Sequence, residues 1–417
     1  TFIYNGGLDV ITDFVAGAAS GSQINLAAFP TVIDFAALQA IASQQGANTV
    51  LTFSASDTLT LNNVTLAALT ADDFVFATGS NTINGTSGPD LLNGTAGADI
   101  INGFSGSDTI NAGAGDDIIN AGSNNSPGGE FDTIRTGSGN DTISFAGAGD
   151  GFFDVRYDDG LSPNGINATI NDLTGTIVKN GGVGTDTLTD VGVINGNTGG
   201  LQIFGTATAD TFVINQAQSS DFVAIRPGGG NDTITNNGVG FVRVEYREAL
   251  GGVSINLSLA SGQVINDGSG GTDTLVGVQE VGGSTGFADT IIGSSGNDRF
   301  RMFGGNDTVD GGAGFDRVRY DRSEFGNLVV NLTTGSAFGT YSNVAFTHTL
   351  TSIEHVRASF GNDILIGSTA SENWEGRNGS DTFVYNGGTD VITDFSAGIG
   401  VGDVLNLSSL SGVSSAN

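Results

Sequence analysis

The chain has 417 residues, with 68 Gly, 5 Pro and no Cys. Its 44 acidic residues outnumber 13 basic residues, and the formal net charge of −31 makes nucleic acid or an anionic membrane surface a poor partner, because both require clustered basic residues. The absence of Cys excludes disulfides and Cys-based zinc sites. An acidic excess of this size repels itself unless a partner neutralises it, and divalent cations are the obvious candidates.

The first stretch of the chain, TFIYNGGLDVITDF at 1–14, recurs as TFVYNGGTDVITDF at 382–395, with 12 of 14 positions identical. This recurrence predicts a slice of a longer, repetitive protein. After the first copy, INLAAFP (24–30) precedes a predicted helix at 34–45, which Asp34 would cap and Gly46 would end. Residues 48–66 then predict a hairpin or meander, and LTADDFVF (69–76) a closing strand.

Residues 85–120 read GTSGPDLLN GTAGADIIN GFSGSDTIN AGAGDDIIN, which is four consecutive units of nine residues. In each unit the Gly-rich part predicts a turn, because Gly reaches φ > 0. The three residues after it predict a short strand with an inward central side chain. Two units would close one coil, so that Asp90 lies over Asp108 and Asp99 over Asp117. Stacked carboxylates and turn carbonyls form a hard oxygen ligand set that suits Ca²⁺, and folding would then be coupled to ion binding.

The same register returns later in the chain, with single units around Asp210 and Asp232 and with Glu372 in place of one Asp. The predicted metal-binding residues are Asp90, Asp99, Asp108, Asp117, Asp132, Asp141, Asp232, Asp289, Asp298, Asp307, Asp316, Asp363, Asp381 and Asp390, with Gly88, Gly97, Gly106, Gly115, Gly139, Gly296, Gly305 and Gly314.

These units resemble the RTX calcium-binding nonapeptide G-G-x-G-x-D-x-U-x, and GGAGFDRVR (311–319) matches every fixed position. The second Gly is often replaced, as at Thr95 and Phe104, which predicts weaker or empty sites there. The resemblance implies a right-handed parallel β-roll, several Ca²⁺ ions and export through a type I channel. Residues 1–77 resemble the β-rich terminal module of serralysin-type and other type I-secreted proteins.

Three inserts between the runs share a second pattern and predict wider coils of one solenoid. His348 occupies the position of Asp186 and Asp273 in the sister inserts, which predicts a surface repeat position instead of a catalytic or metal role. HTLTSIEH lacks the H-E-x-x-H metalloprotease motif, and YDDG (157–160) is a weak carboxylate-pair signal. The aromatic residues at inward unit positions predict core: Phe212, Phe300, Phe383 and Trp374. Arginines in DRVRYDR (316–322) predict an outward strand face paired with local Asp, with a polysaccharide- or phosphate-binding patch as the alternative.

The predicted fold class is all-β, a parallel β-roll or β-helix with a β-rich N-terminal module and one short helix. The predicted divisions are a terminal-type module at 1–77, β-roll at 78–150, wider coils at 151–285, β-roll at 286–319, an insert coil at 320–358, β-roll at 359–395 and the start of another terminal-type module at 396–417. The predicted function is that of a secreted, non-enzymatic, calcium-dependent structural protein of a surface layer, filament or adhesin stalk. Its predicted partners are copies of itself, neighbouring repeats of a longer parent chain or cell-surface polysaccharide. The alternative is the export and folding region of a larger type I-secreted enzyme.

Overall fold

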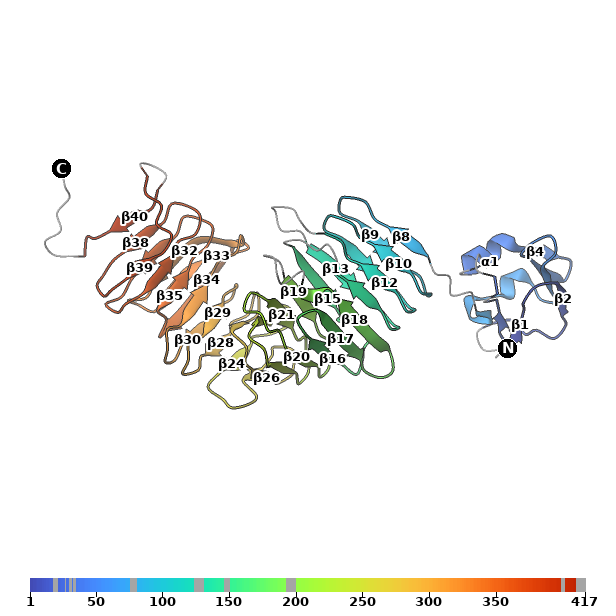
Figure 1. Ribbon diagram of the computed structural model, residues 1–417, viewed down its shortest axis with the longest axis horizontal. Coiled ribbons are helices and arrows are strands. Elements are labelled where there is room, and N and C mark those ends of the chain that lie inside the picture. The colour runs from blue at the N-terminus through green and yellow to red at the C-terminus, as the bar shows by residue number, and fades with distance from the viewer. Residues whose placement is uncertain are drawn as a thin grey trace.

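The computed structural model describes residues 1–17, 22–26, 28–29, 32, 35–75, 81–123, 131–145, 151–192, 200–398 and 402–409. In these residues the protein is all-β with one short α-helix, and it has two separate hydrophobic cores. The smaller core belongs to the N-terminal unit, within residues 1–75, and the larger one runs through a solenoid of parallel coils (Figure 1). No described helix combines the length and apolar character needed to cross a membrane.

Each regular coil of the solenoid is built from two nine-residue units. In the first run of units the central residue of each three-residue strand points inward, so that Ile101, Ile110 and Ile119 are fully buried. Ile101 pairs with Ile119, 18 residues later, in a parallel register. The predicted two-unit coil is therefore confirmed. The aromatic residues predicted at inward positions, Phe212, Phe300, Phe383 and Trp374, are also buried.

The strands of the solenoid form three sheets. The long sheet has thirteen described strands, in the order β39 (Val391–Ile392), β37 (Asn373–Glu375), β35 (His355–Arg357), β31 (Arg317–Arg319), β29 (Arg299–Arg301), β27 (Glu280–Gly282), β23 (Phe241–Glu245), β21 (Phe222–Arg226), β19 (Gly200–Phe204), β15 (Phe152–Arg156), β13 (Phe131–Arg135), β11 (Thr109–Asn111) and β9 (Leu91–Asn93).

The other side of the solenoid is divided between two sheets of ten described strands. The first is ordered β26 (Thr274–Val276), β22 (Thr233–Asn236), β20 (Thr211–Ile214), β16 (Ile166–Ile170), β17 (Thr174–Lys179), β18 (Gly184–Thr189), β14 (Thr142–Ser144), β12 (Ile118–Asn120), β10 (Ile100–Asn102) and β8 (Thr82–Asn84). The second is ordered β25 (Val264–Asn266), β24 (Ser254–Asn256), β28 (Thr290–Ile292), β30 (Thr308–Asp310), β34 (Val344–Thr351), β33 (Ser336–Tyr341), β32 (Phe325–Asn331), β36 (Ile364–Ile366), β38 (Thr382–Val384) and β40 (Val404–Asn406).

The inserts are predicted as wider coils of one solenoid, and in the structure they also contain antiparallel hairpins. The first and third inserts each add a strand, β17 and β33, that pairs antiparallel with both of its neighbours, so the parallel order is interrupted there. The second insert pairs β24 with β25 antiparallel, and the two ten-stranded sheets separate at this insert. The long sheet continues past this point, and the solenoid bends there (Figure 1).

The N-terminal unit contains a three-stranded parallel sheet and a four-stranded sheet. The strands are β1 (Phe2–Ile3), β3 (Ile24–Asn25) and β7 (Phe74–Val75) in the first, and β2 (Leu8–Ile11), β6 (Thr58–Leu61), β5 (Asn48–Thr52) and β4 (Ala42–Gln45) in the second. Short 3₁₀ turns at Leu66–Ala68 and Ala71–Asp73 lead to β7. The hairpin predicted within 48–66 is confirmed by the antiparallel pairing of β5 and β6.

The predicted helix of the N-terminal unit is shorter in the structure. Helix α1 spans Phe35–Ile41, and residues 42–45 form β4 instead of continuing it. Gly46, expected to end the helix, has φ +63° and lies in the turn between β4 and β5. Residues 42–45 form a strand instead of extending the helix because β4 gains a full antiparallel ladder with β5. The proposed cap, Asp34, lies outside the described residues.

The two copies of the opening stretch have the same local structure. In the first copy Phe2 pairs with Ile24, and in the second Phe383 pairs with Leu405. The Tyr4 hydroxyl donates to the Gly7 carbonyl at 2.6 Å, as that of Tyr385 does to Gly388 at 2.8 Å. The copies differ in their neighbours: β38 pairs with β36 of the solenoid, whereas β1 is the outer strand of its sheet.

Candidate metal centres

Most of the repeat aspartates link their own coil to the coil before it. The Oδ1 atom of Asp117 accepts the backbone N–H of Asp99 at 2.7 Å, and Oδ1 of Asp316 accepts that of Asp298 at 2.7 Å. Because the donor is itself the acid of the preceding coil, these carboxylates form ladders of contacts along the turns within each run, and the ladders are interrupted between runs. One oxygen of each carboxylate is therefore already used by the fold, and its second oxygen decides what else it can bind.

In one class of turn, the second oxygen is satisfied by a hydroxyl residue before the acid. Thr95 donates both its backbone N–H, at 2.6 Å, and its hydroxyl, at 2.9 Å, to Oδ2 of Asp99. We call this a hydroxyl turn. The acids held in this way by a preceding Ser or Thr are Asp90, Asp99, Asp210, Asp289, Asp298, Asp363 and Glu372. In Glu372 both donors reach Oε1, and no donor reaches the buried Oε2 atom.

In the other class, the residue four positions before the acid has a positive φ and carries no hydroxyl. We call this an open turn. The residues at that position are Phe104, Gly113, Gly137, Gly228, Gly312 and Arg377, with φ between +70° and +106°. In the open turns of Asp117, Asp232, Asp316 and Asp381, the Oδ2 atom is buried and no hydrogen-bond donor reaches it. A buried carboxylate oxygen without a donor is costly, so these atoms are fitting ligands for a cation.

The two classes follow an order along the chain. The first two units of each run are hydroxyl turns, one on each side of the solenoid: Asp90 and Asp99, then Asp289 and Asp298, then Asp363 and Glu372. Open turns come later in the same runs, as at Asp117, Asp316 and Asp381. A Ser or Thr side chain thus donates to the carboxylate of the first two units of each run.

Backbone carbonyls converge on the same carboxylate oxygens. A Cβ added at Gly103 would lie 2.5 Å from the carbonyl oxygen of Ala121 and 2.8 Å from Oδ2 of Asp108. At Gly311 it would lie 2.0 Å from the carbonyl of Ser352 and 2.7 Å from Oδ2 of Asp316. In the described residues no three His, Cys, Asp or Glu side chains gather closely enough to hold a metal by themselves. The fitting ligand set is therefore mixed, with carboxylate and carbonyl oxygens, which is the chemistry that Ca²⁺ prefers.

Burial raises the pKa of these carboxyl groups, so that they ionise less readily when no cation is bound. Burial, with the nearby Asp141 and Asp99 carboxylates, raises the pKa of Asp117 to about 7. Burial and Asp273 raise the pKa of Asp232 to about 9. A divalent cation would reverse both causes, because it replaces the lost hydration and neutralises the neighbouring charge.

The structure places most of the predicted site residues on these ladders of turns. The predicted glycines differ in backbone conformation: Gly106, Gly115, Gly139, Gly305 and Gly314 have φ between +109° and +144°, and Gly88, Gly97 and Gly296 do not have a positive φ. Oδ1 of Asp390 accepts the N–H of Glu372, and Oδ1 of Asp132 that of Asp108. Part of the turn before Asp132 lies outside the described residues. The assignment of each single residue to a bound ion stays a prediction.

Asp141 has a cation that belongs to the protein itself. The ammonium group of Lys179, the only Lys of the chain, lies 2.9 Å from Oδ2 of Asp141 and 2.7 Å from Oδ1 of Asp186. It also donates to the carbonyl of Gly137 at 2.9 Å, and its side chain is fully buried. Strand β17 thus inserts an ammonium group into the open turn of Asp141, beside the carboxylate for which a calcium ion is predicted.

His348 is buried, so its predicted surface position was wrong. Its predicted equivalence to Asp186 and Asp273 holds in the contacts: Tyr320 reaches His348, as Tyr157 reaches Asp186 and Tyr246 reaches Asp273. The Nε2 atom of His348 lies 3.2 Å from Oδ2 of Asp307. Burial lowers the pKa of His348 to about 3, so the imidazole is neutral at pH 7.

Sequence reasoning missed Lys179, Asp186, Asp267 and Asp273 as parts of these centres. A signal existed in the sequence, because each insert repeats a Tyr followed later by an Asp or His at corresponding positions. The inserts contact turns that lie 38 to 50 residues away in the chain. These contacts depend on the antiparallel hairpin, which the period of nine does not predict.

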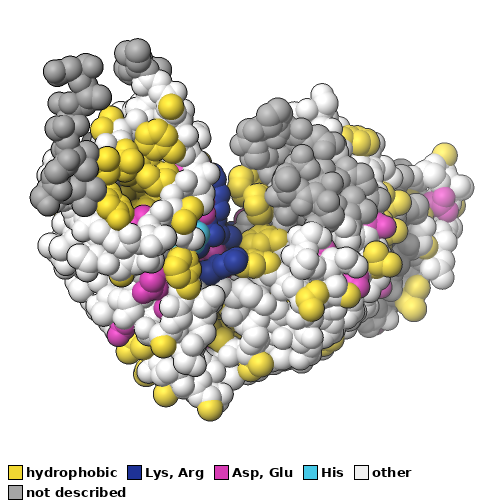
Figure 2. Space-filling model, turned by 60° about the vertical axis from the view of Figure 1, so that its left-hand side comes forward, with side chains coloured by type: hydrophobic (Ala, Val, Ile, Leu, Met, Phe, Trp, Pro, Cys, Tyr) yellow, Lys and Arg dark blue, Asp and Glu magenta, His cyan; other side chains and the backbone are white. Residues whose placement is uncertain are grey.

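The basic residues other than Lys179 are twelve arginines, and all lie on or just after strands of the long sheet. We call this surface the arginine face, and it lies in the hollow between the two halves of the bent solenoid (Figure 2). Its members are Arg135, Arg156, Arg226, Arg243, Arg247, Arg299, Arg301, Arg317, Arg319, Arg322, Arg357 and Arg377. The predicted pairing with local Asp is confirmed for Arg319, which binds Asp321 at 2.7 Å.

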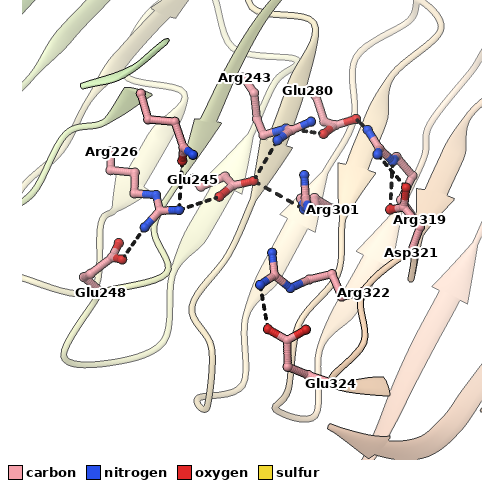
Figure 3. Close-up of polar contacts among 11 residues, drawn as sticks. Arg226, Arg243, Glu245, Glu248, Glu280, Arg301, Arg319, Asp321, Arg322 and Glu324 are labelled. Carbon is pink, nitrogen blue, oxygen red and sulfur yellow. Dashed lines mark hydrogen bonds and ion pairs between the residues drawn. The ribbon is translucent and has the colours of Figure 1, made fainter. Parts of the chain in front are cut away.

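Most of these arginines share carboxylates with neighbouring coils (Figure 3). Glu245 lies within 4 Å of Arg226, Arg243 and Arg301, and Glu280 binds Arg243 and Arg319. Burial alone would raise the pKa of Glu245, but the surrounding arginines hold it at about 2. The network thus keeps a buried carboxylate charged.

Comparison with known protein families finds the RTX calcium-binding nonapeptide repeat in four copies, at residues 77–110, 94–125, 128–151 and 284–318. These segments contain the first run and most of the second, together with their hydroxyl and open turns. Residues 210–273 and 359–395 lie outside the matched segments. The repeats of this family are non-catalytic β-rolls, and they bind Ca²⁺ at several sites. The chain therefore contains RTX calcium-binding nonapeptide repeats, and in the structure these segments fold into parallel β-coils.

Proposed function

We propose that this chain is a secreted structural protein of the cell surface that folds and assembles when Ca²⁺ binds. The observation that carries the proposal is the set of open turns, whose buried carboxylate oxygens lack a donor. In a cytosol poor in calcium these turns would oppose folding, and outside the cell Ca²⁺ at roughly 10⁻⁴–10⁻³ M would fill them. RTX repeat proteins are typically exported by type I secretion, which is consistent with folding after export.

The two ends of the described chain support assembly of copies into a surface layer, filament or adhesin stalk. Strand β1 is an outer strand, and the N-terminal unit exposes Ile3, Leu8 and Val10, each more than half accessible. At the other end a cavity of about 290 Å³ is lined by apolar residues that include Trp374 and Leu405. Strand edges that no described strand pairs with, and apolar ends that no described residue covers, favour pairing with another chain. Because the ends carry the same sequence element, a second copy or a neighbouring repeat is the fitting partner.

The test is a Ca²⁺ titration after chelation, followed by circular dichroism and light scattering. We expect β-structure to form with calcium and particles to grow. In Ile3→Lys/Val10→Lys, folding should persist and particle growth should be lost, whereas Val344→Lys, a matched change on an exposed position within the solenoid, should assemble normally. No response to calcium would contradict the proposal. Folding with a strictly monomeric product would favour the alternative, an export region of a larger type I-secreted enzyme.

For a partner, we propose an anionic polysaccharide on the arginine face. Among the described residues, Arg247, Arg299 and Arg377 have no carboxylate within 4 Å and are stacked over Phe303, Phe241 and Phe360. A guanidinium held on an aromatic ring keeps its N–H edge available for a carboxylate. Arg247 also lines a cavity of about 720 Å³ beside this face, together with Tyr341 and Asn306.

Affinity electrophoresis through polygalacturonate, with dextran as the neutral comparison, tests this partner. We expect retardation by polygalacturonate alone and loss of at least tenfold in affinity for Arg247→Ala/Arg299→Ala/Arg377→Ala. The control Thr176→Asp/Val276→Asp/Thr347→Asp has the same change in net charge on the other sheets, and should bind like the parent. Equal loss in both triple variants would mean that only net charge matters, and the arginine face would not be the site.

A further inference from the structure

The second insert carries three buried carboxylates with no internal cation. Asp232, Asp267 and Asp273 are each at most 2% exposed. Asp273 uses Oδ1 to accept the N–H of Asp232, at 2.8 Å, and Oδ2 to accept the Tyr246 hydroxyl, at 2.6 Å. Asp267 uses Oδ1 for three backbone N–H groups of its own loop, and its Oδ2 has no donor, like Oδ2 of Asp232.

The first insert is the same arrangement, contact by contact. Oδ1 of Asp186 accepts the N–H of Asp141, and its Oδ2 accepts the hydroxyl of Tyr157 at 2.8 Å. Asn140 accepts the N–H of Thr185 there, just as Asn231 accepts that of Thr272 in the second insert. The turns also match, because Gly137 and Gly228 both have positive φ, +80° and +92°.

The two inserts differ in what faces the pair of carboxylates. In the first, Lys179 at the end of β17 places its ammonium between Asp141 and Asp186. In the second, the corresponding hairpin strand β25 is followed by Asp267, whose carboxyl group is close enough to those of Asp232 and Asp273 to interact electrostatically with both. The carbonyl of Gly230 comes close as well: a Cβ at Gly271 would lie 1.6 Å from that oxygen and 2.7 Å from Oδ2 of Asp267.

We propose that Asp232, Asp267 and Asp273, completed by turn carbonyls, bind one Ca²⁺ at the position that Lys179 fills with its own ammonium in the first insert. The site lies outside the segments that match the nonapeptide repeat. It extends the calcium chemistry of the proposed function to the insert at which the two ten-stranded sheets separate. Three buried anions without a cation would be strongly unfavourable, since each loses its hydration and repels the others.

The rival explanation is that protons neutralise the three carboxyl groups in place of a metal. The oxygen-only ligand set and the ammonium at the equivalent position favour a cation, and a hard divalent ion fits carboxylate and carbonyl donors best. The two explanations predict different numbers of Ca²⁺ ions bound per chain at saturation.

The test measures Ca²⁺ stoichiometry of the full chain at pH 7 by isothermal titration and by elemental analysis after gel filtration. We expect Asp267→Asn and Asp267→Lys each to bind one ion fewer than the parent. Asp267→Lys should also unfold at a higher urea concentration than Asp267→Asn in chelator, because the ammonium replaces the ion. Lys179→Met should gain one ion at Asp141 and Asp186. Circular dichroism in excess Ca²⁺ identifies any variant that does not fold. If Asp267→Lys does not fold, the ion count of Asp267→Asn, which preserves the size of the side chain, decides whether the site exists.

The outcomes separate this site from the proposed function. If the parent binds calcium and Asp267→Asn binds the same number of ions, the site is overturned while the calcium role of the repeats stands. If the parent binds no calcium at all, the proposed function fails as well. If Asp267→Asn keeps the parent's stoichiometry and the parent takes up protons on folding in chelator, the carboxyl groups are held by protons.

Discussion

The residue four positions before a repeat aspartate sets how that aspartate is satisfied. A Ser or Thr there supplies two donors to the carboxylate, as Thr95 does for Asp99. A residue with positive φ supplies none, and Phe104 and Arg377 adopt this backbone conformation although they are not Gly. Positive φ costs a bulky residue free energy, so its retention there indicates that the open turn has a use. The expectation of a weaker site at Phe104 does not follow from the geometry, because its turn is open.

We expect Thr95→Gly to convert a hydroxyl turn into an open turn. In chelator the variant should lose about 1–2 kcal/mol of unfolding free energy, because a buried carboxylate loses a donor. Saturating Ca²⁺ should recover most of the loss. Urea denaturation with and without calcium measures both values, and Thr95→Ser, which retains the hydroxyl, is the matched control. An equal loss in both conditions would show that the turn did not gain an ion site.

The buried repeat carboxyls predict a pH dependence that calcium should abolish. Burial and Asp289 raise the pKa of Asp307 to about 8, and burial raises that of Asp363 to about 7. A carboxyl whose folded pKa lies above its unfolded value near 4 stabilises the fold at low pH, and this contribution is lost as pH rises through the folded pKa. The calcium-free chain should therefore be more stable at pH 5 than at pH 8. Urea midpoints across this range test the sign; a midpoint that rises with pH in chelator would contradict it.

At the scale of the element, a strand of three residues contributes one inward side chain. The strand β12 shows the contrast within two residues: Ile119 is fully buried, and Ile118 is 44% exposed. Single strands of this length are stable only because each pairs with strands of the coils before and after it. The inserts follow the same rule with longer strands, and their hairpins turn back to place Lys179 or His348 against a turn of the preceding run.

We expect Ile119→Ala to cost about 2–4 kcal/mol, since it leaves a cavity in a well-packed core. Ile118→Ala in the same strand should cost less than about 1 kcal/mol, because that side chain is partly in water. Thermal or urea unfolding in saturating Ca²⁺ compares the two. Equal losses would mean that the core does not run along the inward positions.

At the scale of the whole molecule, the long sheet and its arginine face join the two halves across the bend. The sheets on the opposite side separate at the second insert, whereas the ion pairs of Glu245 and Glu280 connect β23, β27, β29 and β31. In a chain of net charge −31, concentrating all arginines on this face gives the molecule one surface of distinct electrostatic character.

We expect Glu245→Gln to lower the unfolding free energy by about 3 kcal/mol, because Arg226, Arg243 and Arg301 lose a shared, buried partner. Glu248→Gln is the control: that side chain also binds Arg226 but is 50% exposed, so its loss should cost no more than about 1 kcal/mol. Urea denaturation at two salt concentrations measures both. If the two variants were alike, the network would be a surface feature without a role in joining the halves.

The sequence by itself determined the repeat, the coil and the ion. A period of nine with a Gly-rich turn and one aliphatic centre leaves few folds open, because so short a strand must stack. An acidic chain without Cys and with only two His offers almost only oxygen ligands. The length of α1 was not predictable in this way, because its last turn competes with the pairing of β4 and β5, a contact between separate segments.

Only the tertiary structure decided which carboxylates need an external cation. Asp141 and Asp232 have nearly the same local sequence, GSGND and GGGND. A lysine 38 residues further along satisfies the first, and an aspartate 35 residues further along faces the second. The bend and the position of the arginine face were also decided there, because both depend on where an antiparallel hairpin interrupts one sheet while the other sheet continues. These properties arise from contacts between residues far apart in the chain, whereas the repeat constrains only residues within a coil.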